Sequence, residues 1–160
     1  MRSFLQQVAS MFDSTGSSKY HSLYSWVLKH GTDFASSPLT PEERKIVKRA
    51  AGRKKFPLGC CFQNAQKLVL SDKTGTMAYC EGFALKAGLI PLHHGWATIN
   101  GKVVDLTWLD DSRGQIIGEF AEGWCYFGAT FDRDRTAAQH LSRCTSILDD
   151  WTDRSIMLRE

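Results

Sequence analysis

Residues 96–105 read WATINGKVVD, and this stretch decides the fold. Runs that contain aromatic or β-branched side chains lie on both sides of Asn100-Gly101. An Asn-Gly pair between two such runs is a strong short-range signal for a β-hairpin, because both residues accept the positive φ angles of a type I′ turn. The sequence therefore predicts two antiparallel strands joined at residues 100 and 101.

A two-residue turn also fixes which side chains share a face of the hairpin. Trp96 then falls opposite Asp105, and His94 falls opposite Thr107. Because side chains alternate between the two faces, these four lie on one face, where His94 and Asp105 are diagonal neighbours. His93 falls on the other face. We therefore expect Asp105 to bind His94, unless a one-residue bulge reverses the register in favour of His93.

A histidine held by a carboxylate can transfer protons, and Cys61 is the candidate nucleophile beside it. Residues 61–70 carry apolar side chains at helical spacing, and Pro57 and Gly59 interrupt the chain just before them. The N-terminus of a helix favours a thiolate, and its N–H groups can stabilise an oxyanion. The spacing leaves open whether Cys61 meets His94, since an isolated cysteine is more often a buried structural residue.

Three short motifs in this region resemble the core of transglutaminase-like, papain-like cysteine enzymes. They are GCCFQNA at residues 59–65, HGW at residues 94–96 and VDLTW at residues 104–108. In that family G-x-C opens a helix, H-x-W lies on one strand and an aspartate follows on the next. The resemblance covers about residues 56–108, although Leu106 stands where the family has proline. It implies that Cys61 is the nucleophile, His94 the general base and acid, and Asp105 the orienting carboxylate.

The resemblance also implies the chemistry, which is hydrolysis or transfer at an amide by a peptidase, a deamidase or a transglutaminase-type enzyme. A protein or peptide is then the expected substrate, and no cofactor or metal is expected. The family's glutamine before the nucleophile has no counterpart in residues 55–60, so the candidates for a second oxyanion donor are Gln63, Asn64 or a residue from the N-terminal helices. Glu81 and Trp96 are further candidates for the substrate cleft, although a structural role suits Glu81 equally well and a core position suits Trp96.

Helices are expected at both ends of the chain. A short first helix precedes one that has Ser17 or Ser18 as its N-cap and ends at Gly31. A third helix opens with a capping box at Thr40. Strand character recurs in residues 77–85 and 114–126, and a last helix should run from about Asp132 to Trp151.

Together these elements predict one α+β domain, in which an antiparallel sheet packs on the helix of Cys61 as in papain-like enzymes. Its parts are a helical N-terminal part (residues 1–55), a catalytic core (residues 56–131) and a C-terminal helix (residues 132–160), all within a single domain of residues 1–160.

The composition argues against several classes of protein. With 42% hydrophobic and 11% aromatic residues, a chain of 160 residues can bury a core and is not expected to be disordered. Its apolar runs are shorter than the roughly 20 residues that cross a bilayer. Residues 1–12 lack the pattern of a signal peptide, so the cytoplasm is the expected compartment. An odd number of cysteines suits a reducing compartment, where Cys80, Cys125 and Cys144 are expected to pack.

Three other interpretations compete with the enzyme. A binding module that has the fold but no catalysis predicts ordinary reactivity of Cys61 and no contact between His94 and Asp105. Residues 44–55 carry seven Lys and Arg that could bind an anionic ligand, although a solvated helix face is the commoner outcome and nucleic-acid binding is not expected. A metal site is disfavoured by the spacing of its candidate ligands, which are Cys60, Cys61, Cys80, His93 and His94.

Overall fold

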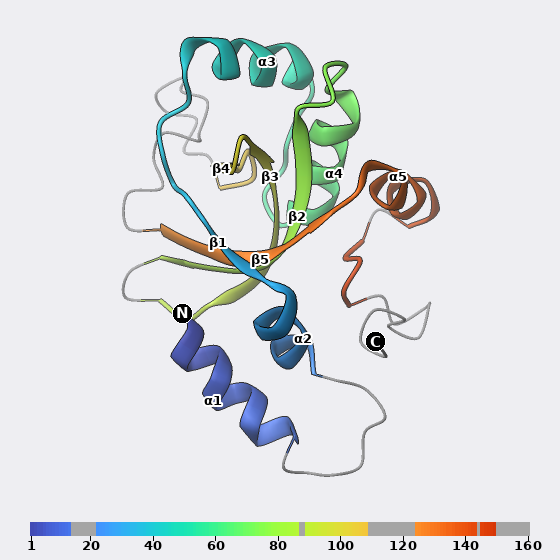
Figure 1. Ribbon diagram of the computed structural model, residues 1–160. Helices are drawn as coiled ribbons and strands as arrows, with labels where there is room; N and C mark the ends of the chain where they lie inside the picture. Colours follow the sequence, from blue (N-terminus) through green and yellow to red (C-terminus); the bar gives the residue numbers. More distant parts are fainter. Residues whose placement is uncertain (14–21, 87–88, 109–123, 144, 150–160) are drawn as a thin grey trace.

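A computed structural model describes residues 1–13, 22–86, 89–108, 124–143 and 145–149. Within these ranges the chain forms five helices and a curled antiparallel sheet of five strands (Figure 1). The elements are, in order, α1 (Arg2–Asp13), α2 (Leu23–His30), β1 (Thr32–Phe34), α3 (Pro41–Ala51), α4 (Cys61–Ser71), β2 (Met77–Lys86), β3 (Leu92–Ile99), β4 (Lys102–Val104), β5 (Trp124–Phe131) and α5 (Arg133–Ser142). The expected α+β class is therefore confirmed. No helix in the described ranges is both long enough and apolar enough to cross a membrane.

The sheet has the strand order β1-β5-β2-β3-β4, so the predicted hairpin of β3 and β4 forms one end of it. Ala97 lies opposite Val104, as the two-residue turn requires. Asn100 and Gly101 have φ angles of 51° and 76°, which are the positive values of a type I′ turn. The predicted register is thus confirmed, and Asp105 follows directly after β4.

Alternation along the strands gives the sheet two different faces. One face packs with side chains of the helices into the larger core, to which the strands contribute Met77, Tyr79, Phe83, Ala97, Ile99, Val104, Phe127, Ala129 and Phe131. The other face holds a smaller cluster that consists of Cys80, Ala84, Trp96, Val103 and Tyr126, with Phe34, Trp108 and Trp124 packed against it. Helix α4 contacts β2 and β3, and Phe62 in its first turn lies against Gly95 of β3, the strand that carries His94.

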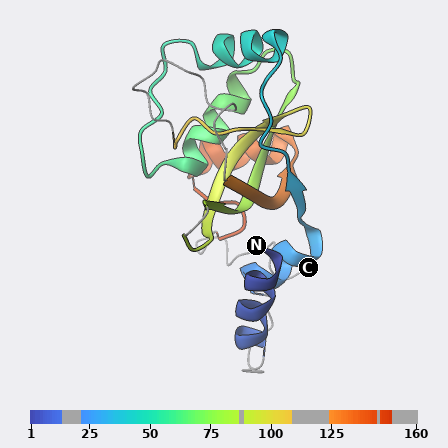
Figure 2. The ribbon, with the colours of Figure 1, turned by 90° about the vertical axis from the view of Figure 1, so that its left-hand side faces the viewer.

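The two ends of the sheet meet at Ala35, the residue that follows β1. Ala35 forms a parallel bridge with Lys102, and its carbonyl accepts a hydrogen bond from Val103 N–H at 3.0 Å. Strand β1 itself pairs with β5 at the opposite end of the sheet. The segment from β1 to α3 therefore starts at one end strand and runs past the other, β4, along the side of the molecule (Figure 2).

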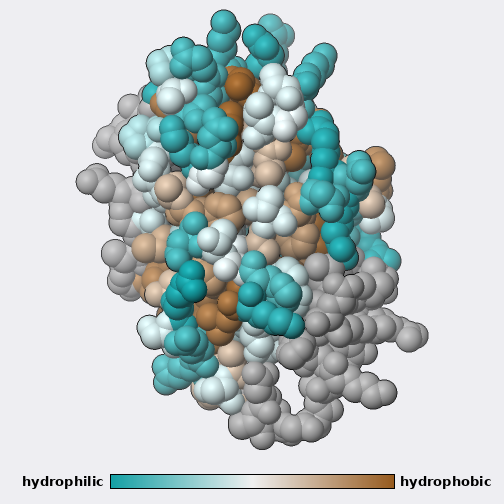
Figure 3. Space-filling view, viewed as in Figure 1, coloured by the Kyte–Doolittle hydropathy of each residue, from teal (hydrophilic) through white to brown (hydrophobic). Residues whose placement is uncertain are grey.

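Local signals correctly predicted helix α3. Thr40 Oγ1 accepts the N–H of Glu43, and Glu43 Oε2 accepts the N–H of Thr40, which completes the capping box. Gly52 ends the helix with a φ of 54°. Lys45 and Lys48 are exposed on this helix, and hydrophilic side chains gather over it in the space-filling view (Figure 3).

Helix α2 begins later than the sequence suggested. Its N-cap is Ser22, whose side-chain oxygen accepts the N–H of Ser25 at 3.1 Å. The expected caps, Ser17 and Ser18, lie outside the described residues. The end of the helix at Gly31 is as predicted. The N-terminal part also contains strand β1, which the sequence did not indicate because its three residues form a strand only by pairing with β5.

The C-terminal region differs more. Helix α5 has Asp132 as its N-cap, as expected, but it ends at Ser142 and does not continue toward Trp151. Ile147 and Leu148 are buried in a segment that is not helical. Their N–H groups bind the side chain of Glu81 in the sheet and not carbonyls of a helix. Strand β5 extends to residue 131, beyond the predicted end, while residues 114–123 and 150–160 lie outside the described ranges.

Candidate active site

His94 and Asp105 form the centre of the candidate site. The Nε2 of His94 donates to Asp105 Oδ2 at 2.7 Å, and the two residues are only 2% and 3% exposed. The second carboxylate oxygen, Oδ1, accepts the N–H of Thr107 at 2.9 Å. Tyr126, from β5, donates its hydroxyl to Oδ2 at 3.0 Å. The carboxylate is therefore held by three donors, so both its position and its orientation are fixed.

Cys61 reaches the same imidazole from the first turn of α4. Burial would lower the pKa of His94, but hydrogen bonds with Asp105 and with Cys61, and the charges of both, raise it from 6.5 to about 9. Since Asp105 occupies Nε2, the other ring nitrogen, Nδ1, is left for the thiol. The structure thus brings Cys61, His94 and Asp105 together from three separate stretches of chain.

Gly95 is what allows α4 to start so close to β3. An ideal Cβ on Gly95 would lie 2.8 Å from Cδ1 and 3.0 Å from Cα of Phe62, the residue after Cys61. Contacts this short exclude any side chain at position 95 unless the helix moves. The glycine in the HGW motif therefore sets the spacing between the helix of Cys61 and the strand of His94.

Aromatic rings enclose the imidazole. Trp108 stacks on His94 with ring centroids 3.7 Å apart and an interplanar angle of 15°. Trp96 is also stacked on His94, with ring centroids 6.5 Å apart, but it is 0% exposed and belongs to the smaller cluster. Trp96 therefore takes the core position and does not line a cleft. The sequence did not assign Trp108 or Tyr126 to the site, although Trp108 belongs to the VDLTW motif.

The remaining candidates have structural surroundings. Asn64 is buried, and its side-chain amide donates both to Pro57 O at 2.8 Å and to Thr107 Oγ1 at 2.9 Å. With both N–H bonds engaged, Asn64 ties α4 to its neighbours and has none left for an oxyanion. Gln63 is exposed on the first turn of α4. Glu81 is 0% exposed, so it does not line a cleft either.

The cysteines differ in their surroundings. Cys60 and Cys61 are half-buried. Cys80 is buried as expected, and burial raises the pKa of its thiol to about 11. Cys125 was expected to pack but is exposed near the start of β5. Cys144 lies outside the described residues. In the part of the chain that the structure describes, no group of three or more His, Cys, Asp or Glu side chains could hold a metal ion.

No model of a protein family matches this chain, and no curated protein and no solved structure matches it. Its chemistry has to be inferred from the residues of the site themselves.

Proposed function

We propose that this protein is a cysteine-dependent amide hydrolase or acyltransferase with Cys61 as nucleophile, His94 as general base and acid, and Asp105 as the orienting carboxylate. One observation carries the proposal. A single buried imidazole bonds to a carboxylate through Nε2 at 2.7 Å, and the thiol at the start of α4 is close enough to raise its pKa. This is the arrangement that thiol acyl transfer requires.

The proposed reaction has two halves. The thiolate of Cys61 attacks the carbonyl carbon of an amide, and the protonated His94 gives its proton to the nitrogen as the C–N bond breaks. An amine leaves, and the acyl group stays on sulfur as a thioester. His94 then takes a proton from a water molecule or from a second amine, which attacks the thioester and releases a carboxylic acid or a new amide.

The first turn of α4 supplies the donors for the tetrahedral intermediate. The first N–H groups of a helix have no partner within it, and at Cys60 no side chain caps them. The N–H of Cys61 is the nearest such donor to the reacting sulfur. A helix N-terminus beside the nucleophile can therefore stabilise the oxyanion without the side chain of Asn64.

We also propose the finer fold assignment and the substrate class. A helix that opens with the nucleophile and packs on an antiparallel sheet agrees with the papain-like, transglutaminase-like pattern of the three motifs. The expected substrate is accordingly a protein or peptide, in the cytoplasm. The competing interpretation, a binding module without catalysis, predicted no contact between His94 and Asp105, and the 2.7 Å hydrogen bond speaks against it.

Alkylation by iodoacetamide tests the proposal, with mass spectrometry to follow each cysteine separately. We expect Cys61 to react at least about tenfold faster than exposed Cys125 at pH values well below 8. Cys125 reports an accessible thiol in the same chain and is therefore the internal reference. His94→Gln should remove the advantage of Cys61 and leave Cys125 unchanged. Equal rates for the two thiols in the wild-type protein would contradict the proposal.

A further inference from the structure

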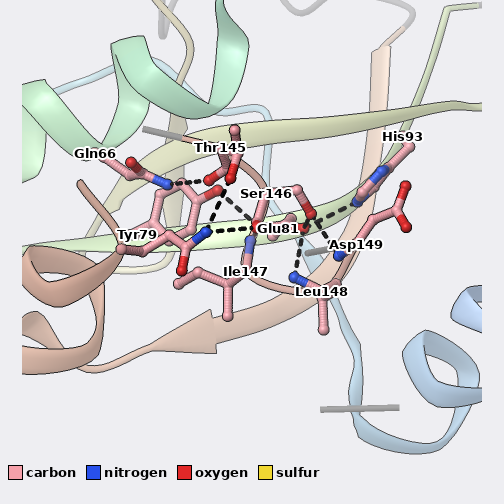
Figure 4. A network of polar contacts seen from close by, with 10 residues as sticks. Gln66, Tyr79, Glu81, His93, Thr145, Ser146, Ile147, Leu148 and Asp149 are labelled. Atoms are coloured by element: carbon pink, nitrogen blue, oxygen red, sulfur yellow. Dashed lines mark hydrogen bonds and ion pairs between the residues drawn. The ribbon is translucent and has the colours of Figure 1, made fainter. Parts of the chain in front are cut away.

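Glu81 is the centre of a second polar network (Figure 4). The strand register puts Glu81 on the face of the sheet opposite His94. The carboxylate is 0% exposed, yet five groups donate to it. They are Tyr79 Oη at 2.8 Å, His93 Nε2 at 3.0 Å, Ile147 N at 2.8 Å, Leu148 N at 3.0 Å and the hydroxyl of Ser146. Burial works against ionisation, but these donors outweigh it and lower the pKa of Glu81. The interior therefore contains a charged carboxylate that the proposed mechanism does not use.

Two of the donors touch the first turn of α4. The hydroxyl of Tyr79 lies 3.1 Å from the place where a Cβ on Gly95 would be, beside Phe62. Burial raises the pKa of Tyr79, and the charges of Glu81 and Cys61 raise it further, so Tyr79 is close enough to Cys61 to sense its charge. Tyr79, which Glu81 holds, therefore lies next to the first turn of α4, which carries Cys61.

His93 contacts the same turn from the side. Its ring lies 5.0 Å from the ring of Phe62 and 5.8 Å from that of Phe83. Because Glu81 binds Nε2 of His93, the orientation of this ring is fixed. Phe62 is thus bounded by two side chains, Tyr79 and His93, that both bind the same carboxylate.

The segment after α5 closes the network. Ser146 and the two residues after it bind Glu81, and Ile147 and Leu148 are buried in the larger core. The preceding carbonyl, Thr145 O, accepts from Gln66 Nε2 of α4 at 2.7 Å. Glu81 therefore connects β2, β3 and the segment of residues 145–149, and that segment in turn holds α4.

We propose that Glu81 is a positioning residue, which holds Tyr79, His93 and residues 146–148 in one buried network and so fixes the first turn of α4 with Cys61 beside His94. Its relevance to catalysis rests on the proposed function. The positioning itself can be measured without turnover, because it concerns the contact between Cys61 and His94.

A double-mutant cycle measures that contact. The pKa of His94 is followed by NMR in the wild-type protein, in Cys61→Ser, in Glu81→Gln and in the double variant. In the wild-type background Cys61→Ser should lower the pKa of His94, since the thiol helps to raise it. In the Glu81→Gln background we expect less than about half of that shift. The direct effect of the Glu81 charge on His94 cancels in the cycle, so equal shifts in the two backgrounds would overturn the proposal.

Glu43→Gln is the matched control. Glu43 is also a buried carboxylate, 6% exposed, but it binds Asn100 and Lys102 at the turn end of β3. Its replacement should leave the shift caused by Cys61→Ser unchanged. If Glu43→Gln reduces the shift as much as Glu81→Gln does, the effect reflects general destabilisation and the proposal is wrong.

If Glu81→Gln does not fold, Tyr79→Phe tests the positioning role instead, since it removes one hydroxyl and keeps the ring. We expect it to reduce the same shift, and an unchanged shift would refute the role of the network. The two proposals fail in different ways. If Cys61 is unreactive but its effect on the pKa of His94 depends on Glu81, the proposed enzymatic function alone is refuted. If Cys61 is reactive but its effect on the pKa of His94 is the same with and without Glu81, the positioning role alone is refuted.

Discussion

The hydroxyl of Tyr126 donates to the same oxygen of Asp105 that binds the imidazole, at 3.0 Å. Tyr126 is buried on β5, two strands away from β3 in the sheet. A hydroxyl that shares this oxygen fixes the carboxylate but also competes with His94 for its negative charge. The strength of the bond between His94 and Asp105 therefore depends on a residue from a distant part of the chain.

Tyr126→Phe should remove the competing donor. We expect the free energy of unfolding to fall by about 1–3 kcal/mol, because a hydrogen bond to a charged group is lost in the interior. The pKa of His94 should rise above about 9, since Asp105 Oδ2 then accepts a hydrogen bond from the imidazole without competition from a hydroxyl. Urea unfolding and an NMR titration measure the two effects. A fall in the pKa of His94 would show that Tyr126 holds Asp105 in place rather than competing with His94.

Asp105→Asn should lower the pKa of His94. Without the carboxylate, burial lowers the pKa of His94 and only the thiol opposes it. We expect the pKa to drop from about 9 toward its ordinary value of 6.5. The selective alkylation of Cys61 should be lost with it. Retention of a pKa near that of the wild-type protein would mean that Asp105 is not the partner that charges His94.

The stability of the fold should decrease in mild alkali. The pKa of His94 in the fold, about 9, lies above its ordinary value of 6.5, so protonation of His94 favours the folded state. This contribution is complete below pH 6.5 and is lost as the pH rises through about 9. Urea unfolding should show a loss of roughly 1–3 kcal/mol across this window, and a much smaller one in His94→Gln. An equal loss in both proteins would assign the effect to other groups.

Gly95→Ala should separate α4 from β3. The added Cβ meets the backbone of Phe62 at 3.0 Å, so the helix itself has to shift. We expect a loss of about 1–3 kcal/mol in stability and loss of the selective alkylation of Cys61. Gly75→Ala is the control, because Gly75 has a φ of 71° but nothing within 4 Å of its Cβ position. It should destabilise the fold through backbone strain while Cys61 stays reactive.

The ion pair between Lys102 and Glu43 should determine part of the acid stability. The hydrogen bond from Lys102, at 2.8 Å, is the main reason that the pKa of Glu43 falls from 4.5 to about 2. Its contribution is therefore present above pH 4.5 and is lost as the pH falls through about 2. Lys102→Met should cost about 1–3 kcal/mol at neutral pH and move acid unfolding to higher pH.

Lys55→Met provides the comparison for that substitution, since Lys55 is exposed beyond the end of α3. Its effect should stay within about 0.5 kcal/mol. If both lysine variants unfold at the same acid midpoint, the bond between Lys102 and Glu43 contributes little to stability.

Local signals predicted the parts of the structure that depend on neighbours in sequence. The turn at Asn100 and the capping box at Thr40 each satisfy their own backbone, so both elements formed where expected. The bond between His94 and Asp105 followed from the same turn, because the turn sets the register of the strands.

Long-range contacts explain what the sequence did not reveal. Strand β1 exists only because β5 pairs with it, and residues 147 and 148 lie outside a helix because Glu81 binds their N–H groups. Tyr126 lies 21 residues from Asp105, and no local pattern relates the two. The same holds for Glu81, whose partners lie up to 67 positions away.

The bridge at Ala35 has a consequence for how this protein behaves at high concentration. An end strand normally presents unpaired amide groups on which a second molecule can add its own strand. Here the N–H of Val103 is already taken by Ala35, and β1 and β4 are each only three residues long. The end strands of the described sheet thus offer a poor template for intermolecular β-pairing. Loss of the bridge should make the protein prone to fibrous aggregation.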